Sequence, residues 1–85
     1  MTRIERIKKI LTDNLKPYHL IILDKSKEHI NHNMFDGLNE THLYLEIGSK
    51  LFNKNKVGIH RKINSLILQE YKKGLHALEI RIINF

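Results

Sequence analysis

The pattern of hydrophobic and polar positions changes its period near the C-terminal end of the chain. Between residues 58 and 73, apolar residues recur at the spacing of one helix face, while lysines occupy other faces. The apolar positions of this face are Ile59, Ile63, Leu66 and Ile67. This spacing predicts an amphipathic helix over residues 58–73. Gly74 suits the left-handed position that ends many helices.

After Gly74 the apolar residues alternate with polar or small ones. One set of alternate positions holds His76, Leu78, Ile80 and Ile82, and the other holds Ala77, Glu79 and Arg81. A period of two predicts a half-buried strand. His76 opens this predicted strand on its apolar side.

The N-terminal segment predicts a first helix. Thr2 and Glu5 have the spacing of a capping box, directly before an apolar stripe. The stripe consists of Ile4, Ile7, Ile10, Leu11 and Leu15. Pro17 ends the pattern, because the residue before a proline disfavours helical dihedrals. We therefore expect a helix over residues 2–15.

Two strands are predicted in the middle of the chain. Residues 18–23, YHLIIL, are rich in apolar and β-branched residues and predict a strand that is buried on both sides for part of its length. Residues 41–48, THLYLEIG, alternate strictly and predict one packed face and one wet face. The packed set is Leu43, Leu45 and Ile47, and the wet set is His42, Tyr44 and Glu46. We expect His42 to have a structural role.

A polar connection of roughly sixteen residues, 24–40, separates these two strands and carries His29 and His32. Connections in compact domains are usually shorter, so this length indicates a functional or mobile loop. Residues 49–55 predict a turn before the second helix.

The order helix, strand, strand, turn, helix, strand predicts a single α+β domain over residues 1–85. We expect a two-layer sandwich with a three-stranded mixed sheet. Both helices would cover one face of the sheet, and its other face would stay open. The first two strands are expected to pair antiparallel.

Composition restricts the chemistry of the chain. The 85 residues contain no cysteine, which excludes disulfides, thiol catalysis and a thiolate metal site built from this chain alone. Six histidines leave imidazole ligation open.

No apolar run approaches the roughly 18 residues of a membrane span, and the charged N-terminus lacks the apolar core of a signal peptide. We expect a cytoplasmic, non-enzymatic protein without membrane contact.

The net charge of +6 is unevenly distributed. No acidic residue occurs between Glu46 and Glu70. Lysines and arginines are frequent in the same segment, among them Lys50, Lys54, Lys56, Arg61 and Lys62. Such a surface attracts nucleic acid or an acidic partner protein, or it is a solvated face that keeps a basic protein soluble.

The histidines allow two explanations each. His76 is a metal ligand or a strand-start histidine whose ring is hydrogen-bonded to the backbone. His29 and His32 belong to a loop that closes on a metal or to a polar loop exposed to solvent. His60, at the start of the second helix, orients a ligand or satisfies a local group.

Four short segments occur in the order, and at about the spacing, of the signatures of the BolA family. They are DKSKEH (24–29), THLYLEIGSKLF (41–52), HRKI (60–63) and GLHALEI (74–80). The family shows an Asp/Asn-Glu-Ser-x-x-His loop, a Thr/Ser-His-Phe strand, a His-Arg helix start and a Val/Ile-His-Ala-Leu final strand. Each motif is short, but together they make essentially the whole chain resemble a BolA-like protein.

This resemblance implies a fold like the type II KH domain and a monothiol glutaredoxin as partner. It also implies a role in iron–sulfur cluster trafficking or iron sensing. A [2Fe–2S] cluster would be shared between the two proteins, with thiolates from the glutaredoxin and glutathione. His76 and one of His29 and His32 would supply this chain's ligands, and His60 would orient a ligand. Alone, the chain is expected to be a monomer or a weak homodimer without a cofactor.

Some members of the family are described as DNA-binding regulators, so DNA is the alternative partner. The usual clamp of a KH domain is a G-x-x-G loop, and the four glycines of this chain do not have that spacing. The cations between Lys50 and Lys62 would have to contact the phosphates instead.

Overall fold

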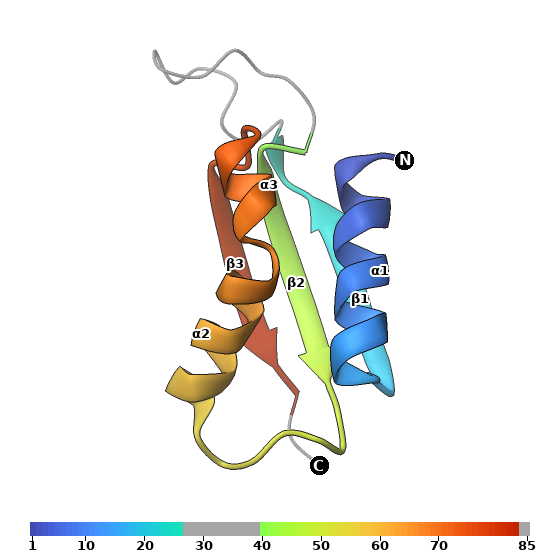
Figure 1. Cartoon of the computed structure of the whole chain (residues 1–85), viewed down its shortest axis with the longest axis vertical. Coiled ribbons are helices and arrows are strands. Elements are labelled where there is room, and N and C mark those ends of the chain that lie inside the picture. Colours follow the sequence, from blue (N-terminus) through green and yellow to red (C-terminus); the bar gives the residue numbers. More distant parts are fainter. Residues whose placement is uncertain (27–39, 84–85) are drawn as a thin grey trace.

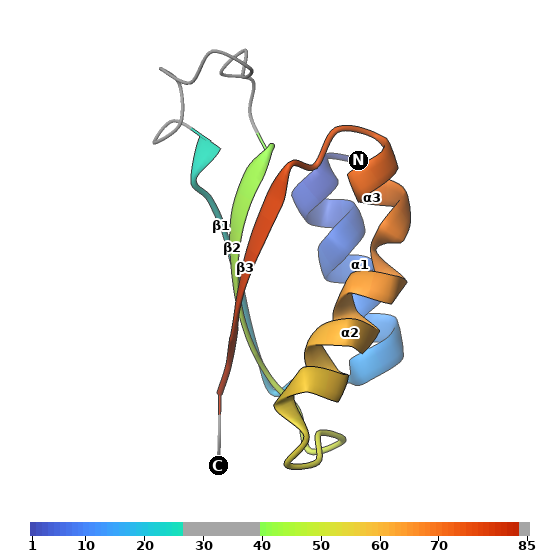
Figure 2. The ribbon, with the colours of Figure 1, turned by 90° about the vertical axis from the view of Figure 1, so that its left-hand side faces the viewer.

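The computed structural model describes residues 1–26 and 40–83. Helix α1 (Arg3–Leu15) precedes strands β1 (His19–Asp24) and β2 (His42–Gly48), and helices α2 (Lys56–Leu66) and α3 (Leu68–Lys72) precede strand β3 (Ala77–Ile82). The sheet has the order β1-β2-β3 (Figure 1). Strand β2 pairs antiparallel with β1 and parallel with β3. The helices cover one face of this sheet (Figure 2), which confirms the predicted α+β sandwich with a mixed sheet.

Helix α1 begins and ends as the sequence predicts. The Thr2 hydroxyl accepts a hydrogen bond from the Glu5 amide, and the Glu5 carboxylate accepts one from the Thr2 amide, which completes the capping box. After Leu15, Lys16 takes a left-handed conformation with φ of 47°. Residues of α1 that face the sheet are buried, namely Ile7, Leu11 and Leu15.

The core lies between the helices and the covered face of the sheet. Strand β2 is the central strand, and it contributes Leu43, Leu45 and Ile47 to this core. The other buried apolar side chains are Ile7, Leu11, Leu15, Ile59, Ile63, Ile67 and Leu75. The alternation read from residues 41–48 therefore describes the inward face of β2 correctly.

In the part of the chain that the structure describes, no helix is long and apolar enough to cross a membrane.

The prediction of one helix over residues 58–73 was wrong. The backbone leaves the α-helical path at Ile67, and α3 starts at Leu68. The Glu70 amide donates to the Ile67 carbonyl oxygen at 2.9 Å, which is a tighter turn of three residues. Both Ile67 and Glu70 are buried, so the break turns an apolar and an acidic side chain inward within one turn.

The buried Glu70 side chain joins α3 to α1. Its carboxylate accepts hydrogen bonds from Nε and Nη2 of Arg6, both at 2.8 Å, and from Nε of Arg3 at 3.2 Å. The Arg6 guanidinium, and after it that of Arg3, holds the pKa of Glu70 below its usual value despite the opposing effect of burial. A charged residue is thus accommodated in the layer of helices because two cations pair with it.

Strand β1 also differs from the prediction. It is an edge strand, and its outward residues Ile21 and Leu23 are 39% and 45% exposed. Leu20 and Ile22 pack against the core from the other side. The apolar run suggested burial on both sides, but among the described residues no second layer covers the outer face of the sheet (Figure 2).

The strand directions bring three chain segments to one end of the sheet. Asp24, at the end of β1, pairs with Leu43 near the start of β2. His42 pairs with Ala77, the first residue of β3. The end of β1, the start of β2 and the start of β3 therefore lie together at the end shown uppermost in Figure 1. We refer to it as the histidine end, because His42 and His76 lie there.

Candidate functional site: the histidine end of the sheet

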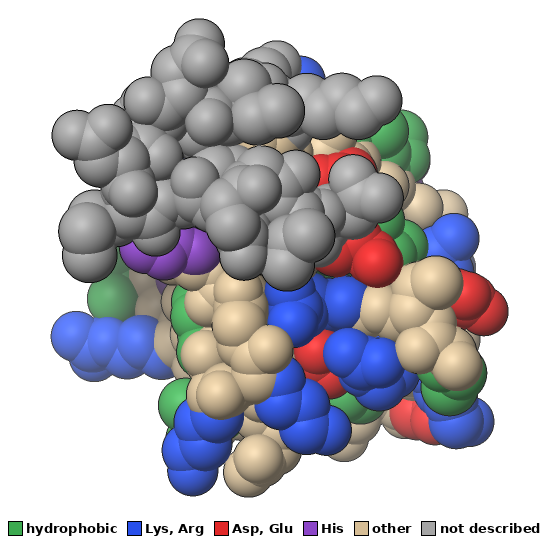
Figure 3. All heavy atoms as spheres, turned by 90° about the horizontal axis from the view of Figure 1, so that it is seen from above, with side chains coloured by type: hydrophobic (Ala, Val, Ile, Leu, Met, Phe, Trp, Pro, Cys, Tyr) green, Lys and Arg blue, Asp and Glu red, His purple; other side chains and the backbone are tan. Residues whose placement is uncertain are grey.

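Two imidazole rings from neighbouring segments meet at the histidine end. The ring centroids of His42 and His76 are 5.0 Å apart, and the ring planes are tilted by 41°. His42 is buried, with 8% of its surface exposed, whereas His76 is exposed. Histidine atoms are visible at the molecular surface in the view onto this end (purple in Figure 3).

The backbone of His76 is fixed by the residue that precedes His42. The carbonyl oxygen of Thr41 accepts hydrogen bonds from the amides of His76, at 2.8 Å, and Ala77, at 3.1 Å. The Thr41 hydroxyl lies 3.2 Å from Nδ1 of the His42 ring. Two consecutive residues, Thr41 and His42, therefore contact the backbone and the ring of the exposed histidine.

Ser26 connects the end of β1 to the start of β2. Its fully buried hydroxyl accepts hydrogen bonds from the amides of Thr41, at 2.9 Å, and His42, at 3.3 Å. The Asp24 carboxylate in turn accepts bonds from the amides of Ser26, at 2.9 Å, and Glu40, at 3.1 Å. The residues that flank the connecting segment, Ser26 and Glu40, are thus held at the histidine end. His29 and His32 lie outside the described residues.

The helices support this end from the covered side. The Glu40 carboxylate accepts a hydrogen bond from the Ile4 amide at 2.7 Å, at the start of α1. Nη2 of Arg3 donates to the carbonyl oxygen of Lys73 at 2.9 Å, directly before Gly74, where the chain turns toward β3 with φ of 120°. The start of α1 and the turn before His76 are therefore linked.

The donor set fits one part of a shared metal site. His76 offers an exposed imidazole on a fixed backbone, and a neutral ring nitrogen is a good ligand for iron or zinc. Within residues 1–26 and 40–83, no group of three or more histidines and carboxylates could hold a metal ion. Because the chain has no cysteine, any thiolate at this site would come from another molecule.

The structure changes the interpretation of His42. The alternation of β2 predicted that this side chain faces solvent, but it is buried and contacts the His76 ring. The His76 ring lies against the His42 ring, and the His42 amide donates to the Ser26 hydroxyl. The available signal was that β2 begins with a histidine and β3 begins directly after one, since parallel pairing brings the two starts together.

His60 does not lie with the other two histidines. It is half-buried on α2 and lines a hollow beside β3 with Ile80 and Ile82. At about 3.3 Å per residue, those positions are about 13 and 20 Å along the strand from His76. This placement gives no support to the prediction that His60 orients the ligand.

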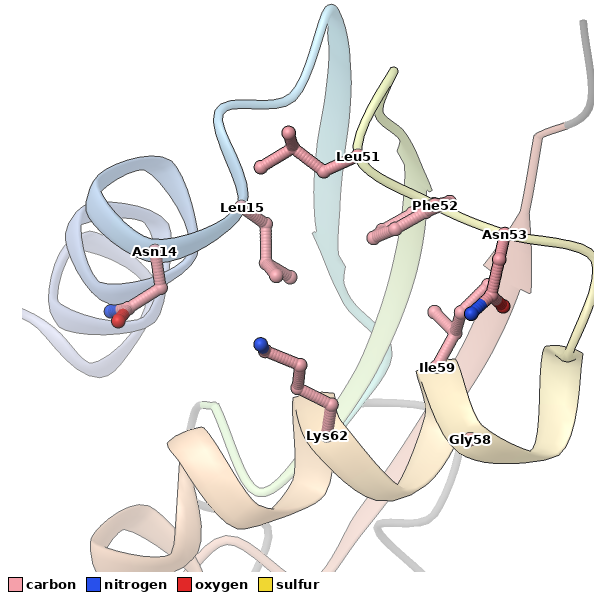
Figure 4. Close-up of a pocket in the computed structure, with 8 residues that line it drawn as sticks. All are labelled: Asn14, Leu15, Leu51, Phe52, Asn53, Gly58, Ile59 and Lys62. Atoms are coloured by element: carbon pink, nitrogen blue, oxygen red, sulfur yellow. The ribbon is translucent and has the colours of Figure 1, made fainter.

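The predicted basic surface is exposed. It consists of Lys50, Lys54, Lys56, Arg61 and Lys62, all of them exposed to solvent. Close to it, a hollow of about 290 Å³ separates the end of α1 from the start of α2. Leu15, Phe52 and Ile59 form its apolar walls, and Lys62 extends its ammonium group toward the end of α1 (Figure 4).

The open face of the sheet carries a polar network between exposed apolar residues. The Tyr44 hydroxyl donates to the Glu46 carboxylate at 2.7 Å, and the His19 ring lies 3.0 Å from the same carboxylate. The hydrogen bond from Tyr44, followed by the one from His19, lowers the pKa of Glu46.

The fold and the motifs define a small α+β protein with paired histidines at one sheet end, and comparison with known proteins gives its family. The family model of BolA-like proteins matches residues 11–84. The chain belongs to the BolA-like family.

Its relatives include proteins of fungi and plants. The chain is 38% identical over 84 residues to UV-induced protein uvi31 of Schizosaccharomyces pombe, covering 94% of this chain and 82% of the relative. The solved BolA domain of SufE1 from Arabidopsis thaliana superposes with a TM-score of 0.84 at 38% identity, covering 96% of this chain and 91% of that one. BolA1 from Arabidopsis thaliana gives a TM-score of 0.82 at 34% identity, covering 96% and 90%.

Proposed function

We propose that this protein is a non-enzymatic adaptor that binds a monothiol glutaredoxin and shares a [2Fe–2S] cluster with it, in cluster trafficking or iron sensing. The observation that carries the proposal is the way in which His76 is presented at the surface. Its ring is exposed, its backbone is fixed by the Thr41 carbonyl oxygen, and the His42 ring lies against it. A ligand to a metal shared with another protein has to be presented at the surface in this way.

In the proposed complex, His76 supplies one ligand and either His29 or His32 supplies a second. The residues that flank the segment carrying His29 and His32 are Ser26 and Glu40, and hydrogen bonds to Thr41 and Asp24 hold them at the histidine end. The glutaredoxin and glutathione would supply the thiolates, which this cysteine-free chain lacks. Replacing thiolate by neutral imidazole raises the reduction potential of a bound [2Fe–2S] cluster.

Visible circular dichroism tests the proposal, because the cluster absorbs there and its signal depends on its ligands. The protein is titrated into a cluster-loaded monothiol glutaredoxin. We expect a new spectrum that saturates as the two proteins reach equal concentrations. A spectrum that stays equal to that of the glutaredoxin alone would refute the adaptor function.

DNA binding is the second candidate, and the exposed basic surface is the observation that favours it. Five cations lie on α2 and on the segment before it, within a stretch that contains no carboxylate. Phosphate contacts by such groups give affinity without sequence readout. The two functions use different parts of the molecule, so variants separate them.

A further inference from the structure

We infer that His42 is a positioning residue for His76: the buried ring packs against the exposed ring and holds it in the orientation needed for ligation. This inference rests on the proposed function, since it explains how the ligand is presented. It concerns only residues that the structure describes.

Two backbone hydrogen bonds fix the main chain at His76, independently of the contacts of its ring. The amides of His76 and Ala77 both donate to the Thr41 carbonyl oxygen, at 2.8 and 3.1 Å. The chain therefore enters β3 with a defined direction. A fixed backbone still leaves the staggered rotamers of an exposed side chain open, so the ring needs a second contact to be ordered.

His42 provides that contact. The distance of 5.0 Å between the ring centroids and the tilt of 41° lie within the range of favourable aromatic pairs. His42 is itself held in place, because its amide donates to the Ser26 hydroxyl at 3.3 Å and its Nδ1 lies 3.2 Å from the Thr41 hydroxyl. The exposed ring thus packs against a ring that is fixed by its own contacts.

An ordered ligand binds more tightly than a mobile one, because less side-chain entropy is lost on binding. The effect of His42 is then to restrict the His76 ring before the partner arrives. His42 is not required as a ligand for this effect. Its ring is buried, and one of its two nitrogens already lies within hydrogen-bond distance of Thr41.

Two substitutions of similar size separate ring packing from the other properties of His42. His42→Phe keeps a planar ring, whereas His42→Leu fills the site without one. Both remove the contact with the Thr41 hydroxyl, so any difference between them reports on the ring. Far-UV circular dichroism and thermal unfolding establish that both variants are folded.

The order of the His76 ring is measured first, by ¹³C relaxation of labelled histidine in the isolated proteins. The titration of cluster-loaded glutaredoxin follows. We expect His42→Phe to retain the ring order and the titration midpoint of the unsubstituted protein. In His42→Leu the ring should become mobile, and the midpoint should rise about fivefold, as expected for one side chain that must be ordered on binding.

Equal ring order and equal midpoints in the two variants would overturn the inference. A mobile His76 ring in His42→Leu without any change of the titration midpoint would also overturn it. So would an equal loss of ring order, or an equal rise of the midpoint, in both variants. If the unsubstituted protein itself leaves the glutaredoxin spectrum unchanged, the proposed function fails. The relaxation comparison still decides in that case whether His42 orders His76.

Discussion

The carboxylate of Glu70 forms a two-point ion pair with the guanidinium of Arg6, with both nitrogen–oxygen distances at 2.8 Å. This pair fixes α3 against α1, and α3 leads directly into the turn before His76. We expect Glu70→Gln to lower the free energy of unfolding by about 1–3 kcal/mol, because the neutral amide keeps one acceptor oxygen and turns an NH₂ donor toward the guanidinium groups. Urea unfolding at neutral pH measures this loss. The matched control is Glu79→Gln, which makes the same change on the exposed side of β3 and should alter stability little.

The same pair predicts a dependence on pH. The pKa of Glu70 is lowered in the folded protein from its usual value of 4.5. Its contribution is therefore fully present above about 4.5 and is lost as the pH falls through the lower pKa of the folded state. The unfolding free energy of the unsubstituted protein should fall more steeply in this acid range than that of Glu70→Gln. Parallel curves for the two proteins would contradict this assignment.

Ser26 is expected to matter for the histidine end through its contacts with the backbone. Ser26→Ala leaves the amides of Thr41 and His42 without their buried acceptor, which should cost about 1–3 kcal/mol of stability. Thermal unfolding measures the loss, and Ser65→Ala on the exposed side of α2 is the matched control. Equal stabilities of the two variants would show that the Ser26 hydroxyl does not hold these strands together.

Gly48 lies against the ring of Tyr18. A Cβ atom at this position would approach the Tyr18 hydroxyl oxygen to 2.6 Å, so the ring would have to move. We expect Gly48→Ala to lower stability by about 1 kcal/mol at most, because the Tyr18 ring is 49% exposed and can turn toward solvent. In a Tyr18→Ala background the same substitution should cost much less. An undiminished cost in that background would assign the effect to the backbone of Gly48 instead.

The basic surface gives a test of DNA binding that leaves the histidine end intact. Lys54→Glu combined with Lys56→Glu should abolish any binding to duplex DNA near physiological salt. Lys8→Glu with Lys9→Glu, on exposed positions of α1, removes the same charge elsewhere and serves as control. If both double variants lose DNA binding equally, or if DNA is bound only at very low salt, the interaction is general charge attraction and not a specific use of this surface.

Most of the fold could be predicted from the sequence because periodicity reports directly on which side of an element is covered. The capping box of Thr2 and the alternation around Leu45 are local signals, and both were correct. The break at Ile67 could not be predicted, since it accompanies an ion pair between Glu70 and Arg6, which are 64 residues apart. The apolar composition of β1 likewise says nothing about whether a second layer covers it.

The candidate site could be predicted in part. The position of His76 at the start of the last strand follows from the alternation after Gly74. The burial of His42 could not be inferred from the alternation of its own strand, because the contact with His76 also requires the parallel pairing of two strands that are distant in the sequence. His60 lies near the start of the second helix, as predicted, but its distance from His76 could not be predicted, because it depends on how α2 lies along β3.

The most direct test of the central claim compares two histidine variants in the titration of cluster-loaded glutaredoxin, followed by visible circular dichroism. His76→Ala removes the exposed imidazole at the histidine end, and His60→Ala removes one that lies away from it. We expect His60→Ala to give the spectrum of the unsubstituted complex and His76→Ala to leave the spectrum of the glutaredoxin alone or to change its shape. A His76→Ala variant that reproduces the unsubstituted spectrum would contradict the assignment of His76 as a ligand.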